Sequence, residues 1–179
     1  MKKEFQIETQ WTAFPLHPET PDEGLTLEEL FTGHNVDIPM MMTRLKEVAE
    51  QEGLPIGVRN KTFNSRLAQE LGKWAETEHQ GEKFHNAAFR SYFVDGENIA
   101  KISVLVDLAK SIGLDEKRAL TILETREFKK VVDQDWLRSY EMGITAVPTF
   151  VINHQALVGA QSYDALKQFL KSNDVKERK

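Results

Sequence analysis

The sequence predicts an α/β protein in which a strand, a block of helices, a strand hairpin and a final helix follow one another. Apolar residues alternate at a spacing of two near the N-terminus, recur at spacings of three and four through the middle, and give way to a β-branched and aromatic run near the C-terminus. With 179 residues and 40% hydrophobic content, the chain can bury one sizeable core, or a core with a smaller subdomain.

The opening segment, residues 4–14, has the pattern of a strand. Phe5, Ile7 and Trp11 fall on one side of an extended chain, because side chains alternate between the two faces of a strand. Three prolines between residues 15 and 21 then end the pattern, since proline lacks a backbone N–H. We therefore expect residues 15–24 to form an irregular connection.

The middle of the chain, residues 26–142, is predicted to be all-helical. Thr26 and Glu29 have the spacing of a capping box, in which each side chain accepts a hydrogen bond from the backbone N–H of the other residue. Pro39 suits the first turn of a second helix, and Gly53 suits its end. Further helices are expected over residues 61–78, 82–94, 103–112, 115–124 and 127–142.

The last part of the chain returns to strands. Residues 148–152 are rich in β-branched and aromatic side chains, Asn153-His154 fits a tight turn, and residues 156–160 can pair back antiparallel. Ser162 is expected to cap a final amphipathic helix. The basic tail, residues 171–179, is expected to be a frayed, solvated end.

The composition argues against several classes of function. A net charge of −5 disfavours nucleic-acid binding, because phosphate contacts need a concentrated basic face. The sequence holds no run of about 20 apolar residues that could cross a membrane. The first residues lack the apolar core of a signal peptide, so we expect a cytoplasmic location. Without a cysteine, the chain holds no disulfide, thiolate metal site or redox couple.

Other candidate sites receive structural interpretations. The five histidines lack the spacing of a metal site, so we expect no metal. Neither a phosphate-binding glycine loop nor a Ser–His–Asp arrangement is present. Met40-Met-Met42 is interpreted as core filling at the start of a helix rather than as an adaptable peptide-binding surface. The carboxylates of Asp133 and Asp135 are interpreted as solvated.

One stretch near the C-terminus reads Gly143-Ile-Thr-Ala-Val-Pro148-Thr-Phe-Val-Ile152 and is followed by Val158-Gly-Ala-Gln161. With the closing helix, it resembles the C-terminal half of a thioredoxin fold as found in the DsbA family. Further stretches resemble the FrnE-like branch, which is also similar to 2-hydroxychromene-2-carboxylate isomerases and kappa-class glutathione transferases: Trp11-Thr-Ala-Phe-Pro-Leu-His-Pro-Glu-Thr-Pro21, Asn64-Ser65 with Ala68, and Phe89-Arg-Ser-Tyr-Phe-Val-Asp-Gly96. The resemblance implies a thioredoxin-like sheet with an inserted all-helical subdomain. Residues 1–25 and 143–179 would form the partial thioredoxin-like domain, and residues 26–142 the helical insertion.

The same resemblance implies that the family's first strand, its Cys-x-x-Cys motif and its first helix are missing. The chain begins at what corresponds to the family's second strand, so the catalytic cysteines have no counterpart. Since the missing strand is a central one in the family, we expect unpaired sheet edges and self-association through them. Three outcomes stay open: the neighbouring strands pair directly, another chain supplies the pairing, or this chain is a shortened version of a longer protein, which we favour.

The resemblance also assigns a substrate-binding loop to Val147, Pro148 and Thr149. Pro148 matches the family's cis-proline, whose loop binds an extended peptide or glutathione by strand-like hydrogen bonds. The alternative is a trans proline that opens an edge strand. The family's members are thiol–disulfide oxidoreductases that act on peptide or protein thiol substrates, but this chain is expected to be redox-inactive without cysteines. Two other functions remain: a non-catalytic peptide-binding or chaperone-like domain, and a glutathione-dependent isomerase or transferase, which alone would need glutathione as a cofactor.

Overall fold

A computed structural model describes residues 1–178 and divides into two compact units. The terminal unit joins residues 1–16 to the chain from residue 134 on, and the helical unit comprises residues 17–133. Both boundaries fall earlier in the chain than the expected ones at residues 25 and 142. At the first boundary this is because the proline-rich connection belongs with the helices: the Asn64 side-chain amide donates to the carbonyl oxygens of Pro18 (3.1 Å) and Thr20 (2.7 Å).

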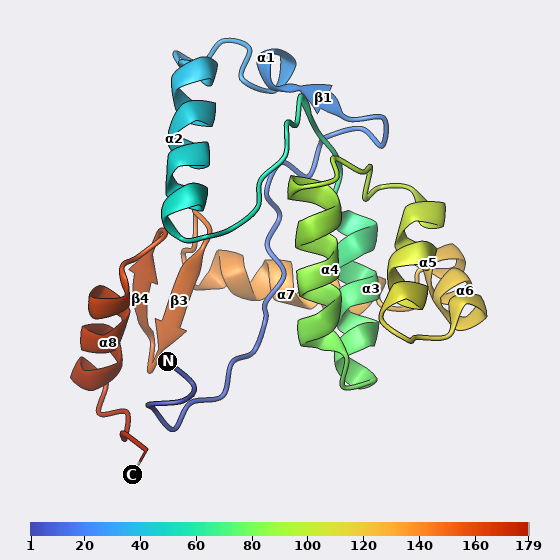
Figure 1. The fold of residues 1–179 in the computed structure, drawn as a ribbon. Coiled ribbons are helices and arrows are strands. Elements are labelled where there is room, and N and C mark those ends of the chain that lie inside the picture. The colour runs from blue at the N-terminus through green and yellow to red at the C-terminus, as the bar shows by residue number, and fades with distance from the viewer. Residues whose placement is uncertain (179) are drawn as a thin grey trace. The chain divides into compact units, whose positions relative to one another are not determined.

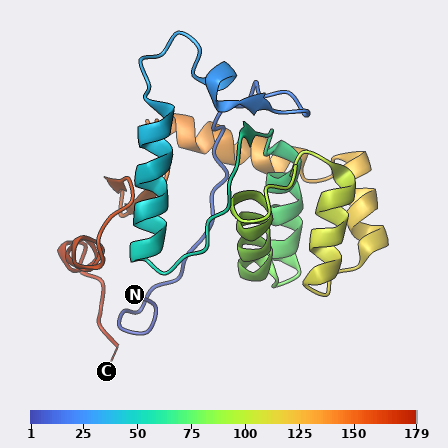
Figure 2. The same cartoon turned by 45° about the horizontal axis from the view of Figure 1, so that its top comes forward.

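The helical unit confirms the predicted run of helices. Its elements are β1 (Leu25–Thr26), α1 (Leu27–Leu30), α2 (Ile38–Gln51), β2 (Lys61–Thr62), α3 (Arg66–Thr77), α4 (Gly81–Phe93), α5 (Ile102–Ser111), α6 (Glu116–Thr125) and the start of α7 (Lys129–Glu141). Helices α3, α4, α5 and α6 pack side by side, as Figures 1 and 2 show from two directions. Every helix within residues 1–178 is too short or too polar to cross a membrane.

One hydrophobic core lies among these helices. On α3, Ala68, Leu71 and Ala75 recur at spacings of three and four, so they share one face of the helix. That face is buried against apolar side chains from the neighbouring helices. The other core residues are Trp74, Phe84, Ile99, Leu105, Ala109, Ala119, Ile122 and Leu123.

Local capping signals begin several helices where the sequence predicts them. The Thr26 hydroxyl accepts a hydrogen bond from the Glu29 backbone N–H (3.1 Å), and the Glu29 carboxylate accepts one from the Thr26 backbone N–H (2.7 Å). The predicted capping box is therefore confirmed. Asp37, Asp115 and Ser162 cap α2, α6 and α8 (Tyr163–Ser172) in the same way, each through one side-chain oxygen.

The start of one helix and the environment of Met40 differ from the predictions for the helical unit. The helix expected over residues 61–78 begins only at Arg66, because Lys61 and Thr62 pair with Leu25 and Thr26 as the short strands β2 and β1. Met40 is not core filling, since its side chain is 68% exposed. It lies nine residues before the buried Ala49, which at about 100° per residue places it on the opposite side of α2.

A buried carboxylate links α3 to the turn after α6. Glu70 is 1% exposed and accepts hydrogen bonds from Arg66 Nε (2.7 Å) and from both Nε and a terminal nitrogen of Arg126 (2.7 Å each). Arg66 also donates to Asp133 (2.5 Å). The interpretation of Asp133 as merely solvated is therefore wrong, because its carboxylate completes a charge network around a buried glutamate.

The terminal unit contains the predicted hairpin. Strands β3 (Thr149–Ile152) and β4 (Gln155–Val158) pair antiparallel, with Ile152 opposite Gln155. Asn153 and His154 connect them with positive φ angles of 48° and 65°, as a two-residue hairpin turn requires. Helix α8 follows the hairpin (Figure 1).

The strand predicted over residues 4–14 is wrong. Only Phe5 forms a β-bridge, with Glu177, and the flanking bonds run from Gln6 N–H to the Lys176 carbonyl (2.8 Å) and from Arg178 N–H to the Glu4 carbonyl (2.7 Å). A strand forms only where a neighbouring strand accepts and donates along its whole length, and among residues 1–178 this segment has none. The prediction that residues 171–179 form a frayed, solvated tail is also wrong for residues 176–178. These residues form the backbone bonds and the bridge to residues 4–6 described above.

Candidate functional site

The three predicted site residues lie together in the loop between α7 and β3. After α7 ends at Glu141, the chain turns at Gly143, whose φ is 66°, and reaches β3 through residues 144–148. The Val147–Pro148 peptide bond is cis. The Thr149 hydroxyl donates to the Ala146 carbonyl (2.6 Å), and the Pro148 carbonyl accepts from Gly159 N–H (2.8 Å). The loop is thus fastened to β4 on one side and closed on itself by Thr149.

Val147 is the residue of this loop whose backbone groups are available to bind another chain. Its side chain is 42% exposed, and Pro148 beside it is also exposed. Within residues 1–178, neither the N–H nor the C=O of Val147 forms a hydrogen bond with another protein group. One donor and one acceptor on the same exposed residue are what an extended peptide needs to add as a strand.

The loop offers binding groups and no group for covalent chemistry. Residues 144–149 read Ile-Thr-Ala-Val-Pro-Thr, so they include no cysteine, histidine or carboxylate. The Thr149 hydroxyl donates within the loop, and no base lies in this stretch to activate it. The arrangement can therefore hold a backbone, but these residues supply neither a thiolate nor a general base.

A buried asparagine supports the hairpin from α8. Asn173 is 7% exposed, and its side-chain amide donates to the Phe169 carbonyl (2.9 Å) and to the Gln155 side chain (3.3 Å). Its own carbonyl accepts from the Asn153 side chain in the hairpin turn (3.4 Å). Asn173 follows α8 as an ordinary polar residue in the sequence, so no local signal predicts this role.

Two side chains of α7, Asp135 and Ser139, hold the opening segment in place at Ala13. Asp135 accepts a hydrogen bond from Ala13 N–H (2.8 Å), and the Ser139 hydroxyl contacts the Ala13 carbonyl (3.4 Å). Asp135 is therefore not simply solvated, which corrects the expectation from sequence. The spacing of four between Asp135 and Ser139 places both side chains on one face of α7.

Electrostatic contacts join the first residues of the chain to α8. The Tyr163 hydroxyl donates to Glu4, and Lys167 donates to the other oxygen of the same carboxylate (3.2 Å). These two hydrogen bonds hold the pKa of Glu4 below its ordinary value, and the Glu4 carboxylate raises the pKa of Tyr163. Glu4 and Tyr163 are exposed and Lys167 is only partly buried, so the contacts orient the segment and contribute little to stability.

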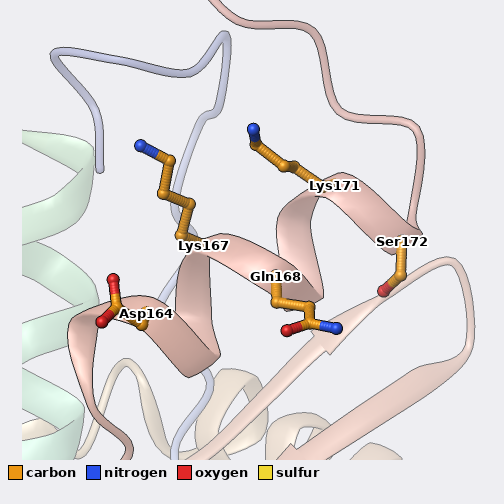
Figure 3. Close-up of a pocket in the computed structure, with 5 residues that line it drawn as sticks. All are labelled: Asp164, Lys167, Gln168, Lys171 and Ser172. Carbon is orange, nitrogen blue, oxygen red and sulfur yellow. The ribbon is translucent and has the colours of Figure 1, made fainter.

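A shallow depression on α8 is the other candidate in the terminal unit. It has a volume of about 490 Å³ and is lined by Asp164, Lys167, Gln168, Lys171 and Ser172 (Figure 3). Its two ammonium groups are already paired, Lys167 with Glu4 and Lys171 with Glu177 (2.9 Å). These ion pairs neutralise the two positive charges that would otherwise attract an anion to the depression. Across residues 1–178, no three histidine or carboxylate side chains are grouped so that they could hold a metal ion.

Comparison with known proteins places the chain among thioredoxin-like domains. The sequence profile described as "DSBA-like thioredoxin domain" matches residues 1–171. The uncharacterized protein YwbO of Bacillus subtilis (strain 168) is 28% identical over 174 residues, which cover 96% of this chain and 84% of that protein. A probable DsbA oxidoreductase of Streptomyces coelicolor has a similar structure, with a TM-score of 0.81, 21% identity, and coverage of 90% of this chain and 73% of that chain. A 2-hydroxychromene-2-carboxylate isomerase gives a TM-score of 0.67 at 17% identity, with coverage of 83% and 70%.

Proposed function

We propose, from the premise that this chain belongs to the DSBA-like thioredoxin domain family, that it binds extended protein segments at Val147, Pro148 and Thr149 without exchanging disulfides itself. The exposed Val147, whose backbone N–H and C=O lack a hydrogen bond within residues 1–178, carries the proposal. An extended segment would satisfy both groups at once, as an added strand does. Its substrates would be extended peptides or proteins, including those that bear thiols.

The absence of disulfide exchange follows from the chemistry of the reaction. Exchange begins when a thiolate attacks one sulfur of a disulfide and forms a mixed disulfide, and a second thiolate then releases the product. This chain has no cysteine, so it can form no mixed disulfide. In insulin reduction by dithiothreitol, we expect the rate with the pure chain to equal the rate without it. Faster turnover would overturn this part of the proposal.

Binding is tested with reduced, carboxymethylated α-lactalbumin, an unfolded protein whose thiols are blocked. We expect fluorescence anisotropy to show saturable binding by the intact chain. Val147→Pro removes the backbone donor and should weaken the affinity by about tenfold or more. Val147→Ala keeps the donor and should bind like the unchanged chain. Equal binding by all three chains would exclude a backbone role for Val147, and an absence of binding by the unchanged chain would overturn the proposal.

Two related functions are separated by simple measurements. A chaperone-like domain would also suppress aggregation of an unfolding client protein, measured by light scattering, and would lose this effect with Val147→Pro. A glutathione-dependent isomerase or transferase would bind reduced glutathione in a calorimetric titration, whereas the proposed function predicts no binding heat. A cytoplasmic location fits the proposal, because reducing conditions there keep the thiols of substrates free.

A further inference from the structure

We propose that a cleft between α4 and α5 binds a short aliphatic diamine, whose ammonium groups pair with Glu97 and Asp107 and donate to the buried Ser91 hydroxyl. The cleft has a volume of about 290 Å³. Its walls are formed by Ser91, Glu97, Val104, Asp107, Leu108 and Ser111. All six lie within residues 91–111 of the helical unit, so the cleft is built without the Val147 loop and without either end of the chain.

Ser91 is the residue that points to a ligand. It lies in the last turn of α4 and is 5% exposed, yet its hydroxyl forms no hydrogen bond within residues 1–178. Its backbone carbonyl is satisfied, since it accepts from Glu97 N–H (2.9 Å). A buried hydroxyl without a partner is destabilising, so such groups normally bind a protein group, a water molecule or a ligand. Because Ser91 lines the cleft, a ligand bound there can reach this hydroxyl.

The two carboxylates at the cleft lack a cation of their own. Glu97 follows α4 and Asp107 lies on α5, both are exposed, and neither forms an ion pair within residues 1–178. The ammonium group of Lys110 pairs with Glu116 (2.9 Å) and lies farther from Asp107. The C-terminal end of α4 adds the partial negative charge of its helix dipole. The cleft therefore attracts cations.

The face of α5 that lines the cleft determines which kind of cation fits. Val104, Asp107, Leu108 and Ser111 recur at spacings of three and four, so they share one side of the helix. Val104 and Leu108 are only partly buried and place apolar surface beside the Asp107 carboxylate. Methylene groups gain from covering such surface, as the stems of lysine side chains do. An inorganic cation would gain nothing from it.

The acidic groups at the cleft are too few for a metal ion. Ca²⁺ takes about 6–8 oxygen ligands, and within residues 1–178 no three carboxylate or histidine side chains are grouped to hold a metal. Two ammonium groups joined by methylenes offer one cation to each carboxylate and an apolar stem to the aliphatic side chains. The Ser91 hydroxyl supplies an acceptor for an ammonium N–H. These groups together favour an aliphatic diamine.

Calorimetric titration with 1,5-diaminopentane at low ionic strength tests the proposal, because salt screens exposed charges. The unchanged chain should show saturable binding, and pentylamine, which lacks the second ammonium, should bind about threefold to fivefold more weakly. Glu97→Gln and Asp107→Asn should each weaken diamine binding to the same extent, since each removes one ion pair. Glu124→Gln is the matched control. It removes an equal charge from an exposed carboxylate of α6 outside the cleft and should leave the affinity unchanged.

Ser91→Ala tests the buried hydroxyl directly. It should weaken diamine binding by about tenfold without changing the circular dichroism, because hydrogen bonds from charged donors are the stronger ones. If this variant fails to fold, amide NMR shifts of the unchanged chain give an independent answer: those of Ser91, Glu97 and Asp107 should move with diamine concentration, and that of Glu124 should not. An absence of binding overturns the proposal, as do equal affinities of the cleft variants and the control, or displacement of the diamine by calcium ions at equal concentration.

Discussion

The helical unit and the terminal unit are stabilised in different ways. In the helical unit, the core side chains of α3, α4, α5 and α6 are removed almost completely from water. Among residues 1–16 and 134–178 of the terminal unit, the buried apolar residues are Phe5 and Leu170, and polar Ser139 and Asn173 are buried as well. Large apolar side chains remain exposed there: Trp11, Leu16, Leu137, Tyr140, Met142, Val147, Phe150, Val158 and Tyr163.

Because of this difference, the unit that contributes most to stability is not the unit that contains the candidate binding site. Burial of apolar surface is the main favourable contribution to folding, so the helical unit should dominate the measured stability of the chain. The terminal unit relies instead on backbone pairing and side-chain hydrogen bonds, such as those of Asn173 and Asp135. Segments with few buried contacts open more easily, and binding sites are commonly found in them. The backbone N–H and C=O of Val147, which form no hydrogen bond within residues 1–178, lie in this unit.

The largest loss of stability is expected when a core side chain of the helical unit is shortened. Phe84 is 1% exposed, and Phe84→Ala should lower the free energy of unfolding by about 3–5 kcal/mol, through lost burial and the cavity left behind. Phe150→Ala in β3 is the matched change in the terminal unit. It should cost below about 1.5 kcal/mol, because Phe150 is already 39% exposed. Urea denaturation measures both, and equal losses would break the comparison.

The buried carboxylate of the helical unit should give the next largest effect. Glu70→Ala leaves Arg66 and Arg126 without their shared partner and should cost about 3 kcal/mol. The exposed pair Lys46–Glu50 is the control, and Glu50→Ala should cost below about 1 kcal/mol. A cost for Glu70→Ala no larger than for the control would show that the buried network contributes nothing.

A third prediction concerns how stability depends on pH through the carboxyl group of Glu76. Burial raises the pKa of Glu76, but the hydrogen bond with His85 (3.4 Å) and the nearby charge of Lys73 lower it further than burial raises it, so the net pKa is below 4.5. A lowered carboxyl pKa stabilises the fold above about pH 4.5, and this contribution is lost as the pH falls through the folded value. Glu76→Gln should therefore cost about 1 kcal/mol near pH 7 and almost nothing near pH 3. A constant cost across this range in urea titrations would contradict the assignment.

The smallest effect is expected at the capping box of α1. Thr26→Ala removes the oxygen that accepts from Glu29 N–H and should cost about 1 kcal/mol. Thr26→Ser keeps that oxygen and should restore most of the loss. Thermal unfolding of the three chains measures the difference, and an alanine variant as stable as the serine variant would exclude the cap as a stabilising contact.

Local signals explain how much of the fold could be predicted. The capping box at Thr26 and the hairpin turn at Asn153-His154 each depend on residues a few positions apart, so the sequence alone identifies them. The strand expected over residues 4–14 fails because its period of two is necessary but insufficient: strand formation also needs a neighbour far along the chain. The pairing of Phe5 with Glu177 has no local signal of any kind.

The candidate site shows the same limit. Val147, Pro148 and Thr149 could be selected only through a resemblance, since three small or apolar residues have no chemical pattern of their own. The hydrogen bond between Asn173 and Asn153 in the hairpin turn spans 20 positions, and the one between Ala13 and Asp135 spans 122. Sequence reasoning therefore located the loop but not the residues that hold the surrounding backbone.

The bridge between Phe5 and Glu177 has a consequence for the order in which the chain can fold during synthesis. All residues of the helical unit are synthesised before residue 134, so that unit can fold before the rest of the terminal unit is complete. The terminal unit joins residues 1–16 to residues from 134 on, and at about 5–20 residues per second the second part arrives about 2–9 s after residue 133. During that interval the first 16 residues have no tail or α8 to pair with, and a chaperone bound near Phe5 would protect the nascent chain from premature association.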